Sequence, residues 1–94
     1  LNMKQKELDF FTKKTNWEIQ KNLIYKKYKL KNFVLVKNFF NLIADESEKQ
    51  NHHPKIIVSY NELEVYLTTH DVGRITEKDL HLASTINEIF NEIR

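Results

Sequence analysis

Three segments of the chain carry apolar residues at helical spacing. Residues about 4 to 14 place Leu8 and Phe11 on one side of a short helix, among lysines and glutamates. A second segment runs from about 32 to 50 and begins with Asn32, a residue type favoured at the N-cap. The third stripe begins at Thr76 and consists of Leu80, Ala83, Ile86, Phe90 and Ile93. We therefore expect three helices.

The segments between these helices alternate apolar and polar residues, as half-buried strands do. One hairpin of two strands is expected around a turn near Lys21-Asn22, with Trp17 as a core or rim anchor. A second hairpin of two strands is expected around Asn61. The order is α-β-β-α-β-β-α. Hairpins that alternate with helices predict the α+β class, a four-stranded antiparallel sheet with three helices packed on one face. A chain of 94 residues makes one domain, residues 1–94.

The helix from 32 to 50 has an apolar face wider than one core requires. Its apolar positions cover an arc of roughly 200°. We expect the row Phe33, Val36, Phe40 and Ile43 to face the core. The surplus face, Leu35, Phe39 and Leu42, needs another partner. A loop of the same subunit could cover it, but so short a chain has few loops. We expect a homodimer or homotetramer assembled through the helix 33–48 and a sheet edge.

Composition narrows the classes of function. The formal net charge of +2 is too small for a typical nucleic-acid binder, so no direct nucleic-acid partner is expected. The chain has no cysteine, which excludes disulfides and thiolate metal sites. No segment approaches the roughly 18 apolar residues of a membrane span, so we expect no membrane partner. These features favour the cytoplasm, with the nucleus as a second compartment.

Three histidines in the second half of the chain are candidates for chemistry. They are His52 and His53, which precede Pro54, and His70. Imidazoles exchange protons near neutral pH without special tuning. If the last two strands pair around Asn61, opposite residues have numbers that sum to about 122, which sets His53 against Thr69 and His52 against His70. The histidines would then lie in one site.

Two carboxylates border this predicted site. Glu48 lies four residues before His52, and Asp79 lies in the first turn of the last helix. Asp79 is open to two interpretations, because Thr76 and Asp79 also match a capping box. His81 is expected to be a surface residue.

These residues carry a family resemblance that spans nearly the whole chain. Three motifs carry it: Glu48-x-x-x-His52-His53-Pro54, then Leu67-Thr68-Thr69-His70-Asp71-x-Gly73, then Ile75-Thr76-Glu77-Lys78-Asp79-Leu80-x-Leu82-Ala83. Their combination resembles the pterin-4a-carbinolamine dehydratases. The resemblance implies the α-β-β-α-β-β-α fold, dimers or tetramers, and dehydration of 4a-hydroxytetrahydrobiopterin to quinonoid dihydropterin in tetrahydrobiopterin recycling. In animal members it also implies a role as dimerisation cofactor of a homeodomain transcription factor.

The chain departs from the family pattern at two positions. Arg74 stands where members commonly have a second glycine, and Ile56 stands where some members have an aromatic residue. The first change makes the loop stiffer and more basic. The second puts a stacking contact with the pterin in doubt.

Loss of water from a carbinolamine needs one proton delivered to the hydroxyl and one removed from nitrogen 5, which suits imidazoles. Our hypothesis makes His53 and His70 the acid–base pair, and His52 assists or binds substrate. Glu48 and Asp79 would orient imidazoles or hold the pterin, and Thr69 would offer backbone contacts. No metal or cofactor is required, because the pterin is the substrate.

Two alternatives remain at this level. The three histidines could bind zinc, although adjacent histidines on a strand point in opposite directions. The chain could instead be a non-catalytic interaction module, or a transcriptional dimerisation cofactor, that acts through its central helix.

Overall fold

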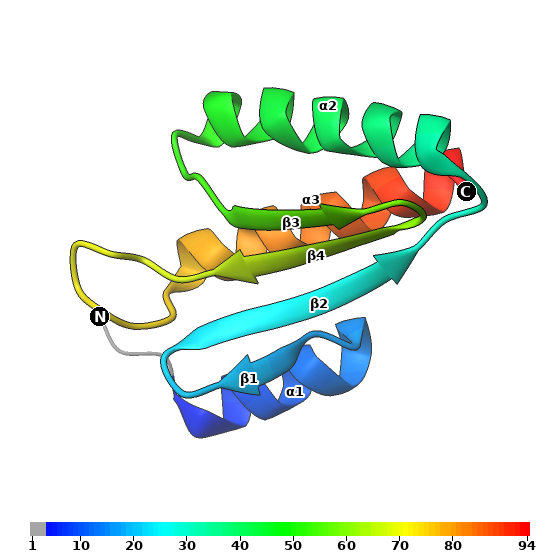
Figure 1. Cartoon of the computed structure of the whole chain (residues 1–94). Coiled ribbons are helices and arrows are strands. Elements are labelled where there is room, and N and C mark those ends of the chain that lie inside the picture. Colours follow the sequence, from blue (N-terminus) through cyan, green and yellow to red (C-terminus); the bar gives the residue numbers. More distant parts are fainter. Residues whose placement is uncertain (1–3) are drawn as a thin grey trace.

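The computed structural model describes residues 4–94 and has the predicted order of elements. The helices are α1 (Gln5–Thr15), α2 (Phe33–Gln50) and α3 (Glu77–Ile93). The strands are β1 (Glu18–Gln20), β2 (Leu23–Lys29), β3 (Lys55–Ser59) and β4 (Glu62–Leu67). Figure 1 shows the two hairpins side by side, with the C-terminal end of α2, the end of β4 and the start of α3 gathered at one end of the molecule.

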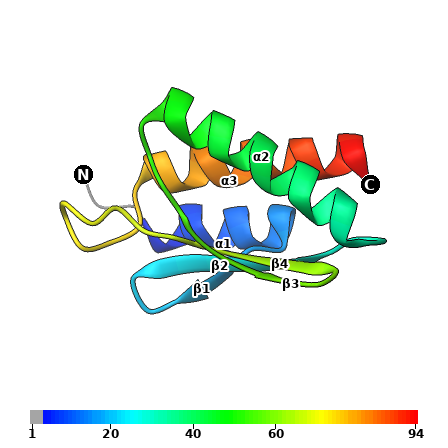
Figure 2. The same cartoon turned by 45° about the horizontal axis from the view of Figure 1, so that its top comes forward.

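The strands form one antiparallel sheet in the order β1-β2-β4-β3. All three helices lie on the same face of it, as Figure 2 shows, so the predicted fold class is confirmed. Alternate residues of the central strands point into the layer between sheet and helices, which is why Leu63, Val65 and Leu67 are buried. Trp17 is also buried there, as predicted. In the described part of the chain, no helix is long and apolar enough to cross a membrane.

A hydrogen-bond network ties α3 to the N-terminal half of the chain. Oδ1 of Asn87 accepts hydrogen bonds from Trp17 Nε1 at 3.2 Å, from Lys26 Nζ at 3.1 Å and from the Tyr28 hydroxyl. Lys26 also donates to the backbone oxygen of Thr15 at 2.8 Å. Burial lowers the pKa of Lys26 and raises that of Tyr28. The network satisfies polar groups that would otherwise be costly to bury.

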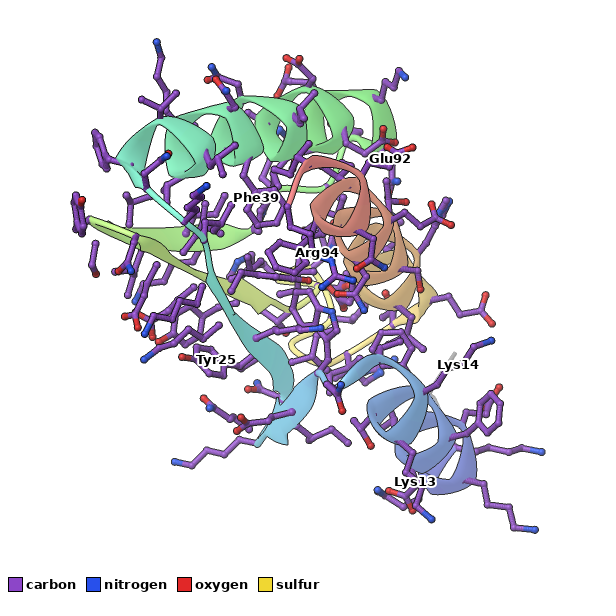
Figure 3. All side chains as sticks on the ribbon, turned by 90° about the vertical axis from the view of Figure 1, so that its right-hand side faces the viewer. Lys13, Lys14, Tyr25, Phe39, Glu92 and Arg94 are labelled. Carbon is purple, nitrogen blue, oxygen red and sulfur yellow. The ribbon has the colours of Figure 1, made fainter. Side chains whose placement is uncertain are left out.

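The face of α2 that meets the core differs from the predicted one. Phe39, expected on the surplus face, is fully buried and packs edge-on against Tyr28 with ring centroids 5.0 Å apart. Phe40, expected in the core, is 41% exposed, and Phe33 is exposed as well. Figure 3 shows Phe39 on the helix side of the sheet, with Tyr25 on the opposite, uncovered side. The error has a simple cause: with apolar residues on both flanks, periodicity alone does not fix which flank faces inward.

The register of the second hairpin is one residue from the predicted one. Ser59 pairs with Glu62 and Lys55 with Tyr66, so Tyr60 and Asn61 form a two-residue turn. Pairing stops at Lys55, so the predicted pairs His53–Thr69 and His52–His70 do not form in the ladder. Two-residue loops are the commonest hairpin connections, and a turn centred on Asn61 alone was the wrong assumption.

Candidate active site

The end of α2 determines where the paired histidines go. Asn51 adopts the left-handed conformation with φ 50°, and its N–H donates to the carbonyl oxygen of Glu48. The N–H of His52 donates to the carbonyl oxygen of Ser47 at 3.0 Å. These bonds satisfy the last carbonyls of the helix and turn the chain toward β3. His52 and His53 therefore follow a fixed helix end directly and precede Pro54.

A short loop after β4 carries the third histidine. Thr69 bridges to Arg74, and the carbonyl oxygen of Thr69 accepts from the N–H groups of Val72 and Gly73. Gly73 has φ +68°, a conformation that glycine adopts without strain. His70 lies in this closed loop and is exposed.

The three histidines line one cavity of about 230 Å³. Its walls include Asn51, His52, His53, Thr69, His70 and Lys78. The structure therefore brings the three imidazoles together, although they are not neighbours in the strand ladder. Residues from the end of α2, the loop after β4 and the first turn of α3 all contribute, which explains why these motifs are far apart in the sequence.

Asp79 lies behind His52 and is fully buried. Its Oδ1 is 2.5 Å from Nε2 of His52, and its Oδ2 accepts from the Thr69 hydroxyl at 2.8 Å and from the Thr76 N–H at 2.9 Å. A carboxylate only accepts hydrogen bonds, so Nε2 of His52 carries a proton. The capping interpretation of Asp79 is confirmed, since one oxygen caps α3, and the other oxygen contacts His52. Its role in the site stays a prediction.

Glu48 makes the corresponding contact with His53 in a more open setting. Its Oε2 lies 2.5 Å from Nε2 of His53. The side chain of His53 is 58% exposed, whereas that of His52 is 11% exposed. Solvent competes with an exposed polar contact, so the Glu48 contact orients His53 less firmly than Asp79 orients His52.

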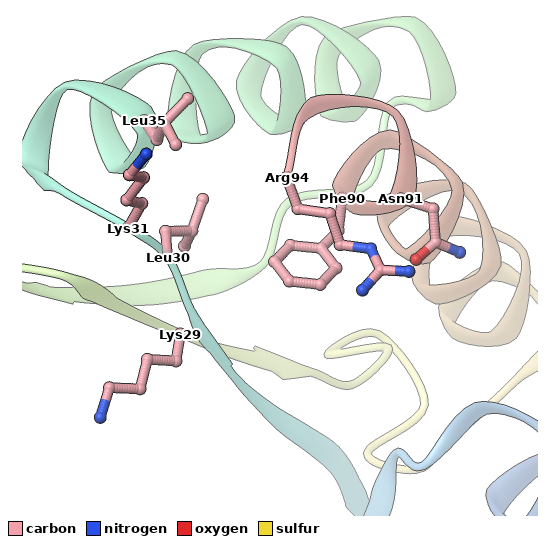
Figure 4. Close-up of a pocket in the computed structure, with 7 residues that line it drawn as sticks. All are labelled: Lys29, Leu30, Lys31, Leu35, Phe90, Asn91 and Arg94. Atoms are coloured by element: carbon pink, nitrogen blue, oxygen red, sulfur yellow. The ribbon is translucent and has the colours of Figure 1, made fainter.

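Further hollows lie outside this cavity. One of about 360 Å³ shares His52 and Lys78 with it and also includes His81, which is exposed as predicted. A larger one of about 580 Å³ lies at the far end of the molecule. Figure 4 shows Leu30, Leu35 and Phe90 there, with Arg94 at the rim. None of the three histidines lines the larger hollow, so size alone does not locate the site.

The described residues contain no cluster of three or more histidine, aspartate or glutamate side chains arranged to hold a metal ion. Two of the imidazoles instead contact separate carboxylates.

Residues 2–89 match the sequence model of a protein family described as pterin 4 alpha carbinolamine dehydratase. The chain belongs to the pterin-4a-carbinolamine dehydratase family. A relative from Picosynechococcus sp. is 41% identical over 73 residues, 78% of this chain and 79% of its own length. One from Aquifex aeolicus is 43% identical over 77 residues, 82% of this chain and 78% of its own length. The names of both relatives mark their assignment as dehydratases as inferred.

Solved structures show the same fold for members of the dehydratase family. A protein from Brucella melitensis, described as a transcriptional coactivator/pterin dehydratase, superposes with a TM-score of 0.87 at 27% identity and covers 95% of this chain and 98% of its own. A pterin dehydratase-like protein described as a RuBisCO assembly factor in the alpha-carboxysome superposes with a TM-score of 0.65 at 15% identity, covering 78% and 84%. The second likeness concerns the fold alone.

Four residues that line the cavity were not among the predicted site residues: Asn51, Thr68, Asp71 and Lys78. Lys78 follows the α3 cap and brings a positive charge to the wall. Asn51 was treated only as a neighbour of the histidines. Both signals were present in the sequence: Lys78 immediately precedes Asp79 in a first helical turn, and asparagine after a helix end readily adopts the left-handed conformation.

Proposed function

We propose that this protein is a lyase that dehydrates 4a-hydroxytetrahydrobiopterin to quinonoid dihydropterin and water, and so recycles tetrahydrobiopterin. One observation carries the proposal: three imidazoles line a single cavity, and two of them are held by carboxylates. Membership of the family supports the class of substrate. We place the reaction in the cytoplasm.

The reaction moves two protons and no electrons between molecules. A general acid protonates the hydroxyl on C4a, the C4a–O bond breaks, and water leaves. A general base takes the proton from N5, and a double bond forms between C4a and N5. Such positioned proton transfers typically contribute about 10²–10⁴-fold to a rate. The scheme needs neither a metal nor a redox cofactor, because loss of water transfers no electrons to or from another molecule.

The geometry suggests a division of roles. His53 and His70 are the more exposed imidazoles and serve as the acid–base pair. His52 is fixed by Asp79 and either assists at the hydroxyl or binds the pterin. Because Asp79 is fully buried with both oxygens occupied, it acts as a positioning residue and not as a substrate contact.

Thr69 and Lys78 have supporting roles. The Thr69 hydroxyl donates to Asp79, while its backbone forms part of the cavity wall. Lys78 offers a hydrogen-bond donor to the carbonyl oxygen of the pterin ring. Neither group takes part in proton transfer in this scheme.

The test is a dehydration assay with freshly generated 4a-hydroxytetrahydrobiopterin, followed by ultraviolet absorbance. We expect His53→Ala and His70→Ala each to reduce kcat strongly, and the double variant to leave only the uncatalysed rate. His81→Ala is the matched control, since His81 is an exposed histidine outside the site cavity. A double variant that dehydrates the substrate at the wild-type rate would refute the proposal.

An interaction role is the second candidate, and exposed apolar side chains on α2 favour it. Phe33, Val34, Phe40 and Leu42 are all exposed. Such a patch on a small protein usually marks a contact surface. Phe39 and half-buried Leu35 take no part in it, contrary to the sequence-based assignment. Phe40→Asp separates the two functions: it should impair association and leave turnover per folded subunit intact.

A further inference from the structure

A hollow of about 580 Å³ lies at the end of the molecule away from the histidines. It is bounded by the end of β2, the link from β2 to α2, the first turn of α2 and the last turn of α3. Figure 4 shows its two walls, with Lys31 and Leu35 on one side and Phe90 and Arg94 on the other. Ligand sites commonly have volumes of about 300–1,000 Å³, so the hollow has room for a small organic molecule.

The floor of the hollow is apolar and is held in place by the core. Leu30 is buried, whereas Leu35 and Phe90 are half-buried and keep part of their surface accessible. The Phe90 ring packs against Tyr28 and Phe39, with ring centroids 4.9 and 5.7 Å apart. These contacts fix the ring before any ligand arrives. An aromatic floor of this kind favours a ligand with an aromatic ring, which can stack on it or pack edge-on.

Positive charge surrounds this apolar floor. Lys29, Lys31 and Arg94 line the hollow, whereas no aspartate or glutamate among the described residues does. The first turn of α2, which forms part of the wall, also has no acidic residue. Glu92 is close in sequence, but it lies about 200° around the helix from Arg94 and outside the hollow. The hollow therefore suits a ligand that carries a negative charge.

Two of the three cations keep their charge available for a ligand. Within residues 4–94, neither Lys31 nor Arg94 forms an ion pair. Lys29 stands opposite Glu62 on β4, which partly balances its charge. The Arg94 guanidinium lies 5.9 Å from the centroid of the Phe90 ring, at the border of the aromatic floor. A planar guanidinium binds a carboxylate through two parallel N–H···O bonds, so Arg94 is placed to hold one beside a bound ring.

We propose that this hollow is a binding site for a small aromatic carboxylate. The ring of the ligand lies on Leu30, Leu35 and Phe90, and its carboxylate accepts hydrogen bonds from the Arg94 guanidinium. Lys31 attracts the same negative charge from the facing wall. The hollow shares no lining residue with the cavity of the three histidines, so the proposal does not rest on the proposed function.

The position of the hollow also predicts an effect on stability. A ligand here joins the start of α2 to the end of α3, whereas the histidines lie near the end of α2 and the start of α3. A ligand that binds only the folded chain stabilises it by mass action. The melting temperature should therefore rise with the concentration of the aromatic carboxylate.

Three probes separate the contribution of the charge from that of the ring. They are 2-naphthylacetate, its neutral amide 2-naphthylacetamide, and acetate, each titrated by calorimetry into the whole chain. We expect sub-millimolar binding of 2-naphthylacetate and an affinity for the amide that is lower by at least about tenfold, because the amide loses the charge-assisted hydrogen bonds. Acetate should not bind measurably, since it has no ring to bury. Only 2-naphthylacetate should raise the melting temperature strongly.

Nuclear magnetic resonance gives the location of the bound probe. Amide chemical shifts should change most in residues 29–35 and 90–94 and remain nearly constant at the three histidines. Addition of 7,8-dihydrobiopterin should not displace 2-naphthylacetate, because the two ligands would occupy separate cavities.

Exposed cations provide variants that should fold normally. Arg94→Met keeps an apolar side chain but removes the guanidinium, and should weaken binding of 2-naphthylacetate by about tenfold while the affinity for the amide stays the same. Lys31→Met should weaken binding by a smaller factor, because its charge acts from the facing wall. Lys13→Met is the matched control, since Lys13 is an exposed lysine of α1 outside the hollow.

The proposal has clear points of failure. Equal affinities for 2-naphthylacetate and its amide, or an affinity for the acid that Arg94→Met leaves unchanged, would overturn the assignment of a carboxylate site. Shift changes centred on the histidines, or no binding of 2-naphthylacetate at all, would overturn the location. None of these measurements depends on turnover, so failure of the dehydratase proposal would leave this test intact.

Discussion

Replacement of Asp79 by asparagine tests the most constrained contact of the site. Asp79 accepts hydrogen bonds from His52, Thr69 and the Thr76 N–H. Asparagine keeps the shape but replaces one acceptor oxygen with an NH₂ donor. If its oxygen continues to cap Thr76, the NH₂ group faces Nε2 of His52. The imidazole must then accept at Nε2, which reverses its tautomer, or rotate away.

The magnitude follows from burial. Hydrogen bonds to charged groups contribute about 1.5–3 kcal/mol each, and a mismatched buried donor adds a desolvation cost. We expect Asp79→Asn to lower the free energy of unfolding by about 2–3 kcal/mol. The carboxylate is fully buried and does not reach the substrate, so its effect on turnover passes through His52. If His52 assists at the hydroxyl, kcat should fall by up to about 10²-fold, the lower end of what general acid–base groups supply; if it binds the pterin, KM should rise instead.

The assay compares kcat and KM of Asp79→Asn with those of a variant that is destabilised elsewhere. Asn32→Ala serves as that control, because Asn32 caps α2 at the end opposite the histidines and accepts from the Leu35 N–H at 2.9 Å. Its loss costs about 0.5–2 kcal/mol and should leave kcat unchanged. If Asp79→Asn keeps both kcat and KM within twofold of wild type, the positioning role is wrong.

Three further predictions concern the rest of the structure. Glu48→Gln should reduce kcat by less than about tenfold, since its exposed contact with His53 contributes only about 0–1 kcal/mol, and 0.5 M salt should shrink the difference from wild type. Asn87→Ala should cost at least about 2 kcal/mol of stability because it leaves several donors without an acceptor, as urea unfolding followed by tryptophan fluorescence would show; a loss below 0.5 kcal/mol would contradict this. The hydrogen bond to Glu64 raises the pKa of Tyr25, so the folded chain keeps this proton when the unfolded chain loses it near pH 10, and stability falls as the pH rises further. Tyr25→Phe should reduce the slope of the unfolding free energy against pH by an amount equivalent to up to one bound proton. An unchanged slope in urea titrations at alkaline pH would refute this prediction.

Patterns of residues predicted the elements because they are local. Alternation along residues 62 to 67 and the helical stripe after Thr76 are each set by which side chains must be buried. The candidate site also followed from sequence, since the motifs around His52, His53 and His70 flank one hairpin. Two predictions were wrong, the inward face of α2 and the register of the second hairpin. Phe39 is buried where Phe40 was expected, and the hairpin turn has two residues.

The sequence by itself determined the order of elements, the fold class and the family, because periodicity and motif spacing are written in the order of residues. Only the tertiary structure decided that Asp79 both caps α3 and holds His52, that Asn51 turns the chain into the site, and that Lys78 lines the cavity. These facts depend on contacts between the end of α2, the loop after β4 and the start of α3. Such contacts arise when the helices pack across the sheet, and no local pattern encodes which oxygen then meets which nitrogen.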